Sequence, residues 1–375
     1  MKPITNCLRY VLLALPLLFF TCKDKDPGPD TDDVVYIAGQ SLYALDAATG
    51  NKRWTYSIPG PSTSFSEGNP TVTNGVVYCV GHSFPISNQN SLNAINAATG
   101  TLKWQVTNVG NFMSGPPVVA NDLVYISGGA FVYALDTNTG TVRWKANPFG
   151  TNDTGNPAVA NGLVYVTSYS KCMAFDAITG ALKWTFTMDT DSHFRTPIIS
   201  GGSLYVGSGG TYYALDATTG ASKWMVKMSA GSYATDPPVV VDGVGYVGDV
   251  NGNLQAIDPA TGMSKWTKTG LMFPYMPSVG KSLLYVATIN PFRIVAVSVA
   301  DGSTKWEVKL PDFSSGSPTL SNGTVYVGNQ QKGLYAIDAV TGTVKWTAAS
   351  LGNTIYSNPC VVTKNGKVVL PGIGN

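Results

Sequence analysis

One motif recurs eight times along this chain of 375 residues and restricts the folds that the chain can adopt. Its first copy runs Ala44-Leu45-Asp46-Ala47-Ala48-Thr49-Gly50-Asn51-Lys52-Arg53-Trp54. Every copy has an Ala ten residues before a Trp, a Gly four residues before it, and Lys or Arg directly before it. Successive copies lie 40 or 42 residues apart after a first interval of 50, a period typical of β-propellers and related repeat arrays. The copies account for all eight tryptophans: Trp54, Trp104, Trp144, Trp184, Trp224, Trp266, Trp306 and Trp346.

Each residue type of the motif suits a strand, a tight turn and a second strand. The Gly can adopt the positive φ of a tight turn, at which a β-carbon costs energy. A buried Trp removes about 150–250 Å² from water, or roughly 4–6 kcal/mol before opposing effects. Because one four-stranded sheet cannot cover such a ring, we expect each Trp to dock on a neighbouring sheet, with the preceding basic residue solvated on the opposite face. The residues expected to accept hydrogen bonds from the turn backbone are Asp46, Asn96, Asp136, Asp176, Asp216, Asp258, Ser298 and Asp338.

Each repeat contains four short β-rich runs, which we call strands A to D from the axis outwards. In the third repeat they are residues 117–120, 123–127, 131–136 and 141–145. Pairs such as Asn74-Gly75 and Asn322-Gly323 between strands A and B are hairpin turn signals. The content of 41 Gly and 23 Pro also suits a turn-rich all-β chain.

The two ends of the repeat region predict how the ring closes. The first repeat begins at strand B, residues 34–38, and has no strand A before it, whereas residues 358–362 form a strand A without its own repeat. The sequence therefore predicts an all-β, monomeric, eight-bladed β-propeller over residues 34–375, with four-stranded antiparallel blades, closed by N- and C-terminal strands that share one blade. A further β-rich run, residues 367–370, could pair outside the sheet, compete with residues 34–38, or fray.

The N-terminal residues are predicted to be a targeting signal rather than part of the fold. Lys2 and Arg9 precede an apolar run, Val11 to Phe20, that is too short to span a bilayer stably. We expect residues 1–22 to be a lipoprotein signal that ends at a lipidated Cys22, with an ordinary secretory signal or a membrane anchor as the alternatives. Residues 23–33 then form a polar tether. The protein would be an outer-membrane lipoprotein, facing either the periplasm or the cell surface.

The AxDxxTGxxxW repeat resembles the tryptophan-docking motif of propellers of the pyrroloquinoline-quinone (PQQ) type. Together with the lipoprotein signal, it resembles the BamB family of the outer-membrane β-barrel assembly machine. The resemblance covers residues 34–375 and implies a non-enzymatic scaffold whose partner is an envelope protein such as a barrel-assembly subunit. In that family, neighbouring D–A loops that carry an Arg and acidic residues contact this subunit, which makes Arg195 and Asp236 candidates.

The loops between strands D and A and between strands B and C differ from blade to blade, and both sets are expected on one face. This face is our candidate binding surface, because aromatic and Arg side chains are typical anchors of protein interfaces. The alternative is that the rings, including Phe65, plug the channel or cover their own blade. The candidate residues are Glu67, His82, Phe112, Asp153, His193, Phe194, Arg195, Tyr233, Asp236, Phe273, Tyr275, Phe313 and Tyr356.

Other features argue against a catalytic or metal centre. The chain has two His residues, predicted on distant blades, although Glu67 could approach His82. Asp249-Val250-Asn251-Gly252-Asn253 is similar to part of a calcium loop, but a plain turn is the favoured interpretation. Cys79, Cys172 and Cys360 lie in different repeats, and we expect them to be buried small side chains.

Two other classes of function stay open. A cell-surface module could bind a glycan or another ligand through the same aromatic loops. A PQQ-dependent dehydrogenase is less favoured, because such enzymes carry a vicinal disulfide, a Trp beneath the cofactor and acidic calcium ligands. We therefore expect no enzyme activity, no cofactor and no metal. The net charge of +2, with basic residues spread one per repeat, also predicts no nucleic-acid partner.

Overall fold

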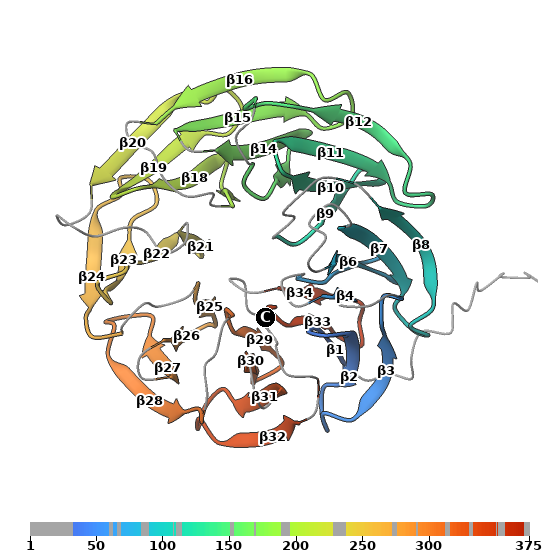
Figure 1. Cartoon of the computed structure of the whole chain (residues 1–375). Coiled ribbons are helices and arrows are strands. Elements are labelled where there is room, and N and C mark those ends of the chain that lie inside the picture. The colour runs from blue at the N-terminus through green and yellow to red at the C-terminus, as the bar shows by residue number, and fades with distance from the viewer. Residues whose placement is uncertain are drawn as a thin grey trace, which may run out of the picture.

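The protein is a closed ring of eight β-sheets (Figure 1). The computed structural model describes residues 33–59, 63–65, 69–83, 90–107, 109, 115–150, 154–168, 170–188, 196–227, 238–271, 276–289, 292–311, 316–329, 333–349, 351 and 357–370. The expected signal peptide, Cys22 and nearly all of the tether lie outside these residues. Among the described residues there is no helix of the length and apolarity that crossing a membrane requires.

The eight sheets share one antiparallel strand order, so the all-β eight-bladed prediction is confirmed. From blade 1 to blade 8, the A strands are β33 (Cys360–Val362), β5 (Thr71–Thr73), β9 (Val118–Ala120), β13 (Ala158–Ala160), β17 (Ile198–Ser200), β21 (Val239–Val241), β25 (Ser278–Val279) and β29 (Thr319–Ser321). In the same blade order, the B strands are β1 (Val34–Ala38), β6 (Val76–Ser83), β10 (Leu123–Gly128), β14 (Leu163–Ser168), β18 (Ser203–Ser208), β22 (Val244–Gly248), β26 (Leu283–Thr288) and β30 (Thr324–Asn329).

The C and D strands carry the repeated motif and form the outer half of each blade. The C strands are β2 (Leu42–Asp46), β7 (Ser91–Asn96), β11 (Phe131–Asp136), β15 (Lys171–Asp176), β19 (Thr211–Asp216), β23 (Leu254–Ile257), β27 (Arg293–Ser298) and β31 (Gly333–Asp338). The D strands are β3 (Lys52–Tyr56), β8 (Leu102–Thr107), β12 (Val142–Ala146), β16 (Leu182–Thr187), β20 (Ser222–Lys227), β24 (Ser264–Lys268), β28 (Thr304–Lys309) and β32 (Val344–Ala348).

Blade 1 closes the ring as the sequence predicts, because β33 from the C-terminus pairs with β1 from the N-terminus. The run at residues 367–370 contributes β34 (Val368–Val369), which pairs with β33 on the side away from β1. It therefore neither competes with β1 nor leaves the sheet, and blade 1 has five strands. Blade 2 also gains a fifth strand, β4 (Thr63–Ser64), which pairs with the end of β6.

Each indole lies between two blades and bonds to the backbone of the next blade. The Nε1 atom of each Trp donates to a carbonyl oxygen in the C–D turn of the following blade, at 2.8–3.2 Å. The last of these bonds, from Trp346 to Ala47, joins blade 8 to blade 1. Trp144 is buried, whereas the other seven keep one edge exposed. The ring is thus locked by the same contact at all eight interfaces.

The Trp indole of the preceding blade packs directly on the motif Gly. A β-carbon at Gly220 would lie 2.6 Å from Cε3 of Trp184, and the other seven motif glycines are equally covered by the Trp of the preceding blade. These glycines also have φ between 71° and 75°. The sequence predicted the positive φ of this Gly. The motif Ala pairs with its own Trp across the C–D ladder, as Ala134 does with Trp144.

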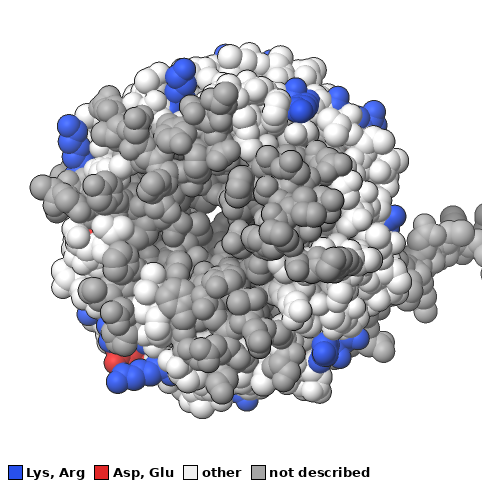
Figure 2. All heavy atoms as spheres, in the orientation of Figure 1, with Lys and Arg blue, Asp and Glu red and all other residues white. Residues whose placement is uncertain are grey.

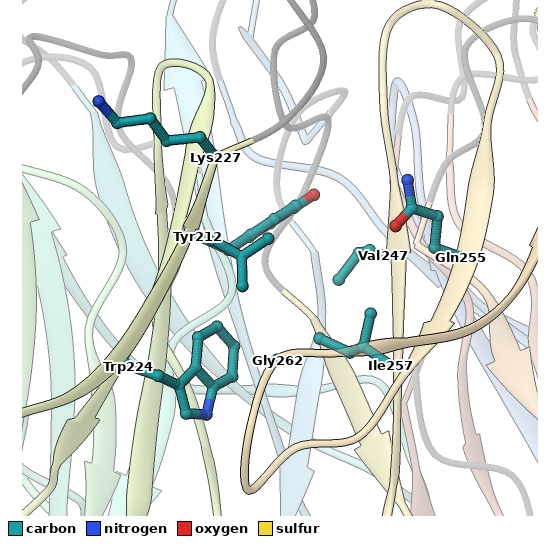
Figure 3. A pocket seen from close by; sticks show the side chains of 8 residues that line it. Tyr212, Trp224, Lys227, Val247, Gln255, Ile257 and Gly262 are labelled. Atoms are coloured by element: carbon teal, nitrogen blue, oxygen red, sulfur yellow. The ribbon is translucent and has the colours of Figure 1, made fainter.

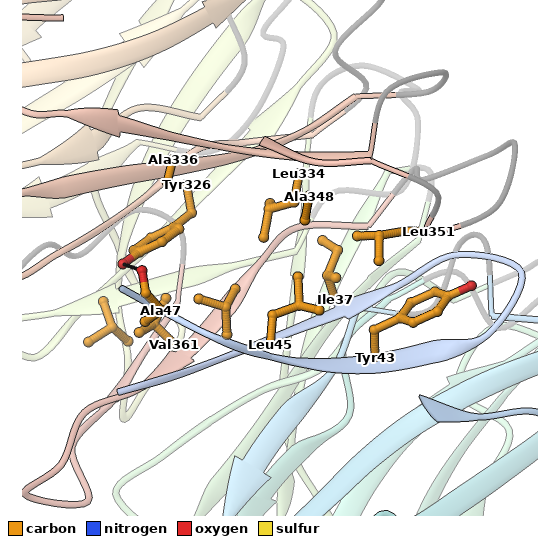
Figure 4. Close-up of a cluster of buried hydrophobic side chains, with 12 residues drawn as sticks. Ile37, Tyr43, Leu45, Ala47, Tyr326, Leu334, Ala336, Ala348, Leu351 and Val361 are labelled. Atoms are coloured by element: carbon orange, nitrogen blue, oxygen red, sulfur yellow. Dashed lines mark hydrogen bonds between the residues drawn. The ribbon is translucent and has the colours of Figure 1, made fainter. Parts of the chain in front are cut away.

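A Tyr on each B strand completes the interface, and the sequence analysis missed it. Its ring lies 5.8–6.2 Å from the Trp of the same blade. In six interfaces its hydroxyl donates to the carbonyl that the Trp also uses. Figure 4 shows one such bond, from Tyr326 to Ala47, within the apolar cluster that closes the ring. The signal was available in the sequence as a Tyr near the middle of every B strand.

The basic residue before each Trp is not simply solvated on the opposite face. Register between strands C and D shifts directly after the motif Ala, so Ala134 pairs with Trp144 whereas Leu135 pairs with Val142. Arg143, between them, is the extra residue of a β-bulge, which redirects its side chain. It lies 2.8 Å from the Asp136 carboxylate, and four other blades have the same ion pair at 2.8–3.6 Å. The expected solvation is confirmed for seven of the eight basic residues, which are exposed, whereas Arg53 is half-buried. The simple alternation along strand D is interrupted by the bulge.

Candidate functional site

The candidate surface is the rim at which the D and B strands end and the A and C strands begin, which we call the loop rim. The antiparallel pairing brings these four ends to one side of every blade. Most of the predicted binding residues lie outside the described residues, so their roles stay predictions. They are Glu67, Phe112, Asp153, His193, Phe194, Arg195, Tyr233, Asp236, Phe273, Tyr275, Phe313 and Tyr356.

Two rim residues of blade 2 turn inward. The sequence placed His82 in a B–C loop, but it lies in β6, paired with Ser64, and only 6% of it is exposed. Phe65, which follows β4, is fully buried, and its ring centroid lies 6.0 Å from that of Tyr56. For Phe65 the alternative interpretation holds, since its ring fills the interface between blades 1 and 2. The cause is β4, which extends the sheet to a point where the sequence predicted only loop.

A set of polar residues links the blades beside the axis, and we call it the axial collar. Each member directly precedes the Pro that opens an A strand: Asn69, Asn156, Thr196, Ser317 and Asn358. The amide of Asn156 donates to Oγ1 of Thr196, 3.1 Å away in the next blade. Its side chain also occupies the space that a β-carbon at Gly115 would need. This arc therefore ties blades 3, 4 and 5 together.

The second arc of the axial collar ties blades 8, 1 and 2 together. The backbone N of Ser317 donates to Oδ1 of Asn358 at 2.7 Å, and the backbone N of Asn358 donates to Oδ1 of Asn69 at 2.6 Å. These bonds use polar groups that would otherwise face the channel without a partner in the protein. The collar was missed because a polar residue before a Pro reads only as a loop signal.

The acidic turn at Asp249 and the three described cysteines, which the sequence analysis considered for metal or thiol chemistry, have structural roles. Both carboxylate oxygens of Asp249 accept bonds from Asn253, at 2.8 Å each, so the turn interpretation is confirmed. Within the described residues there is no group of three His, Cys, Asp or Glu side chains that could hold a metal. Cys79, Cys172 and Cys360 are free and buried, as expected. Burial raises the pKa of Cys360 to about 12, which keeps that thiol protonated and unreactive.

Two of the hollows lined by described residues lie between blades, and neither was predicted from the sequence. One, of about 230 Å³, lies between blades 2 and 3 at the rim opposite the loop rim and is lined by polar turn residues such as Asn74, Lys103 and Asp122. The other, of about 100 Å³, lies between blades 5 and 6 (Figure 3). It is lined by Tyr212, Trp224, Val226, Lys227, Val247, Gln255, Ile257 and Gly262.

Charge is distributed evenly over the described surface. On the face drawn in Figure 2, the described Lys and Arg side chains are spaced around the circumference and do not gather over one group of blades. Several of them are the motif residues already paired with Asp. The described residues on this face therefore form no concentrated basic patch.

The architecture by itself defines the class of protein. Eight four-stranded blades, locked by an indole on the Gly of the next blade, are a PQQ-like β-propeller. A family model described as outer membrane protein assembly factor BamB matches residues 23–171, 88–195, 170–281 and 270–372. The chain belongs to this family.

Individual relatives match shorter stretches. BamB of Escherichia coli (strain K12) is 32% identical over 89 residues, which cover 23% of each chain. BamB of Moranella endobia is 28% identical over 138 residues, 35% of each chain. The serine/threonine-protein kinase AfsK of Streptomyces griseus is 28% identical over 128 residues, 30% of this chain and 15% of the kinase. The chain thus spans about a third or less of the length of these relatives.

Solved structures agree on the fold. BamB from Moraxella catarrhalis superposes with a TM-score of 0.64 at 17% identity, covering 79% of this chain and 92% of that one. A europium-containing methanol dehydrogenase superposes with a TM-score of 0.65 at 15% identity, covering 81% of each chain. At these identities the likeness establishes the propeller and leaves the activity open.

Proposed function

We propose that this chain is a non-enzymatic, lipid-anchored scaffold of the outer membrane that holds an envelope protein on its loop rim and takes part in outer-membrane protein assembly. The observation that carries the proposal is the family match over residues 23–372, whose description is an outer membrane assembly factor. Curated relatives with the same description, such as BamB of Escherichia coli, support it.

The geometry of the ring suits such a role. All eight indoles and their glycines are used in interfaces between blades, and the motif carboxylates are used in turns and ion pairs. The axial collar bonds neighbouring blades directly below the loop rim. A platform that is already rigid loses little conformational entropy when a partner binds, so more of the contact energy appears as affinity.

The proposal assigns no reaction and no cofactor to the chain, although a dehydrogenase shares the fold. The eight tryptophans are committed to docking, and the three described cysteines are free and sit in different blades. A dye-linked oxidation assay after incubation with PQQ and calcium tests this point. Turnover of an alcohol at a rate that depends on PQQ would contradict it.

The test of the partner site is a pair of substitutions on neighbouring D–A loops. Arg195→Ala combined with Asp236→Ala should leave the melting temperature within about 2 °C of the wild type, since surface changes cost little. The same variant should recover at least fivefold less partner after cross-linking on membranes and mass spectrometry. Lys103→Ala combined with Asp122→Ala, at the opposite rim, is the matched control and should capture the partner normally.

A second experiment tests the anchor and its side of the membrane. Cys22→Ser should abolish palmitate labelling and move the protein out of the membrane fraction. Protease treatment of intact cells then separates the two locations, because a periplasmic scaffold is protected and a surface module is digested. Digestion together with unchanged capture by the Arg195 and Asp236 variant would favour the alternative of a glycan- or ligand-binding surface module.

A further inference from the structure

Among the described residues, the interface between blades 5 and 6 has the smallest apolar cluster. Its cluster contains three buried residues, Tyr212, Val247 and Ile257, with Trp224 packed against them. Each of the other seven clusters contains between nine and twelve. Since cores normally pack as densely as organic crystals, this thin interface requires a local cause.

Two residues on the face of blade 6 that meets blade 5, Gly245 and Gln255, differ from their equivalents in the other blades. Of these, only Gln255 lines the hollow, because Ile257 fills the space that a β-carbon at Gly245 would need. Gly245, in β22, occupies the position at which the other seven blades have Val or Leu, for example Leu204 in blade 5. Gln255 directly precedes the motif Ala, where the others have four Tyr residues, a Met, a Val and an Asn. All seven of those side chains are buried, for example Tyr213 at 2% exposure, whereas Gln255 is partly exposed.

The resulting cavity of about 100 Å³ has a defined chemistry. Its walls are the rings of Tyr212 and Trp224 and the aliphatic side chains of Val226, Val247 and Ile257. The hydroxyl of Tyr212 donates to the carbonyl of Gly248 at 2.9 Å, which holds this ring across the interface. In Figure 3 Lys227 lies at the edge, and its ammonium points away from the other lining side chains. The walls thus combine aromatic and aliphatic side chains with an equal share of polar surface.

The Gln255 amide is one polar group of this wall. Gln255 lies across the cavity from Tyr212 (Figure 3) and makes no hydrogen bond to the described residues. Its amide can both donate and accept, so it can satisfy a single hydroxyl or carbonyl on a ligand. An apolar cavity of roughly 150 Å³ in another protein takes up benzene. This hollow is smaller, about 100 Å³, and open on one side, so a ring enters it with its substituent at the mouth.

We propose that this cavity is a binding site for a single-ring aromatic molecule that carries one hydrogen-bonding substituent, as in phenol. The ring packs between Tyr212, Trp224 and the aliphatic wall, and the substituent bonds to the Gln255 amide. Offset or edge contacts with aromatic rings favour a flat ligand over a branched aliphatic one. The site lies between two blades, next to the loop rim, and is formed by strands β19, β20, β22 and β23 together with Gly262 of the next turn.

The test uses the full chain and phenol as the probe, with binding followed by saturation-transfer NMR and titration. The wild type should bind phenol more tightly than toluene. Gln255→Tyr installs the residue that four other blades have at this position. It should fill the cavity, abolish phenol binding and raise the melting temperature. Gln255→Leu replaces the amide with an apolar side chain and should weaken phenol binding about tenfold, because one hydrogen bond is lost, while toluene binding stays unchanged.

Two results would overturn the proposal. One is the absence of saturation transfer to phenol at millimolar concentration with the folded wild-type chain. The other is unchanged phenol binding in Gln255→Tyr, once circular dichroism shows that this variant is folded. If Gln255→Tyr does not fold, Gln255→Leu tests the proposal. An equal loss of binding affinity for phenol and for toluene in this variant would exclude the hydrogen bond to Gln255.

Discussion

A single backbone carbonyl in the C–D turn accepts hydrogen bonds from two aromatic side chains of the preceding blade in six of the interfaces. At the interface of blades 7 and 8, Tyr285 and Trp306 both donate to Ala339, at 3.0 and 3.1 Å. A buried hydroxyl or indole nitrogen without a partner would cost free energy, so this shared acceptor makes the large apolar rings usable at the interface. Burial raises the pKa of Tyr285 to about 12, so the hydroxyl stays a donor at alkaline pH.

Substitution of the motif Gly separates its two roles. At Gly220 the φ is 74° and a β-carbon would lie 2.6 Å from Trp184, whereas at Gly162 the φ is 75° and no atom lies within 4 Å. Gly162→Ala should cost about 1–2 kcal/mol, the strain of a left-handed conformation. Gly220→Ala should cost about 1–3 kcal/mol more, because the indole must move. Urea denaturation of both variants measures the difference.

The comparison is controlled by the similar φ of the two positions. Equal losses in the two variants would show that only backbone strain matters and that the indole yields without cost. The contact between Gly220 and Trp184 would then not contribute to interface stability.

At the scale of the element, one carboxylate holds the C–D turn. One of its oxygens accepts hydrogen bonds from the turn backbone, and the other pairs with the basic residue before the Trp. In blade 4 Oδ1 of Asp176 accepts the backbone N–H groups of Ile178 and Thr179, while Oδ2 lies 3.2 Å from Nζ of Lys183. In blade 7 a different residue accepts the hydrogen bonds of this turn. Ser298 replaces the carboxylate, and Asp301 accepts from the backbone N and hydroxyl of Ser303. The turn therefore depends on an acceptor in this region more than on one sequence position.

These carboxylates predict how stability responds to acid. The backbone N–H of Thr179, followed by Lys183, lowers the pKa of Asp176 to about 2, and bonds to Ser303 and Thr341 lower those of Asp301 and Asp338 similarly. A lowered pKa in the folded state stabilises the protein above the ordinary value near 4, and this stabilisation is lost as the pH falls toward 2. The melting temperature should therefore fall between pH 4 and pH 2.

A matched variant assigns this effect to the turns. Asp176→Asn should reduce the slope of melting temperature against pH in that window, because the variant has one fewer carboxylate to protonate. Asn96 shows that an amide can hold the turn, since its Oδ1 accepts from Ala98 and Thr99 at 2.9 and 3.0 Å. A slope identical to that of the wild type would locate the acid sensitivity elsewhere.

At the scale of the whole molecule, stability depends on a closed circle that one short strand completes. β33 pairs with β1, and the cluster between blades 8 and 1 includes residues from both ends of the described chain, such as Val35 and Val361. Without β33 the edge of β1 would be open, and open edges favour association with other chains. The added strand β34 covers β33 and buries Val369.

Two truncations test the closure. Removal of residues 364–375 deletes β34 and should cost about 1–3 kcal/mol, the burial of roughly one Val side chain, while the oligomeric state stays that of the wild type. Removal of residues 357–375 also deletes β33 and should produce oligomers in size-exclusion chromatography and a broad thermal transition. A synthetic peptide of residues 357–370 should restore the oligomeric state of the wild type. A sharply melting shorter variant with the wild-type oligomeric state would show that the ring holds without its closing strand.

Much of the ring could be predicted because the motif repeats. Strand order, eight blades, the turn acceptors and the shared first blade follow from the spacing of Ala, Gly and Trp and from the missing strand A. The bulge at the basic residue could not be predicted, because it depends on how strand D pairs with strand C. The inward position of His82 could not be predicted either, since it depends on β4 pairing from a distant loop.

The sequence by itself determined the blade, because strand period, turn residues and the docking indole act over distances of about 40 residues along the chain. Only the tertiary structure decided what happens between blades: which carbonyl two aromatic donors share, how the axial collar joins neighbours, and where a hollow remains beside Gln255. The physical reason is that these contacts join residues from separate repeats. Their geometry exists only once eight sheets have closed on one another.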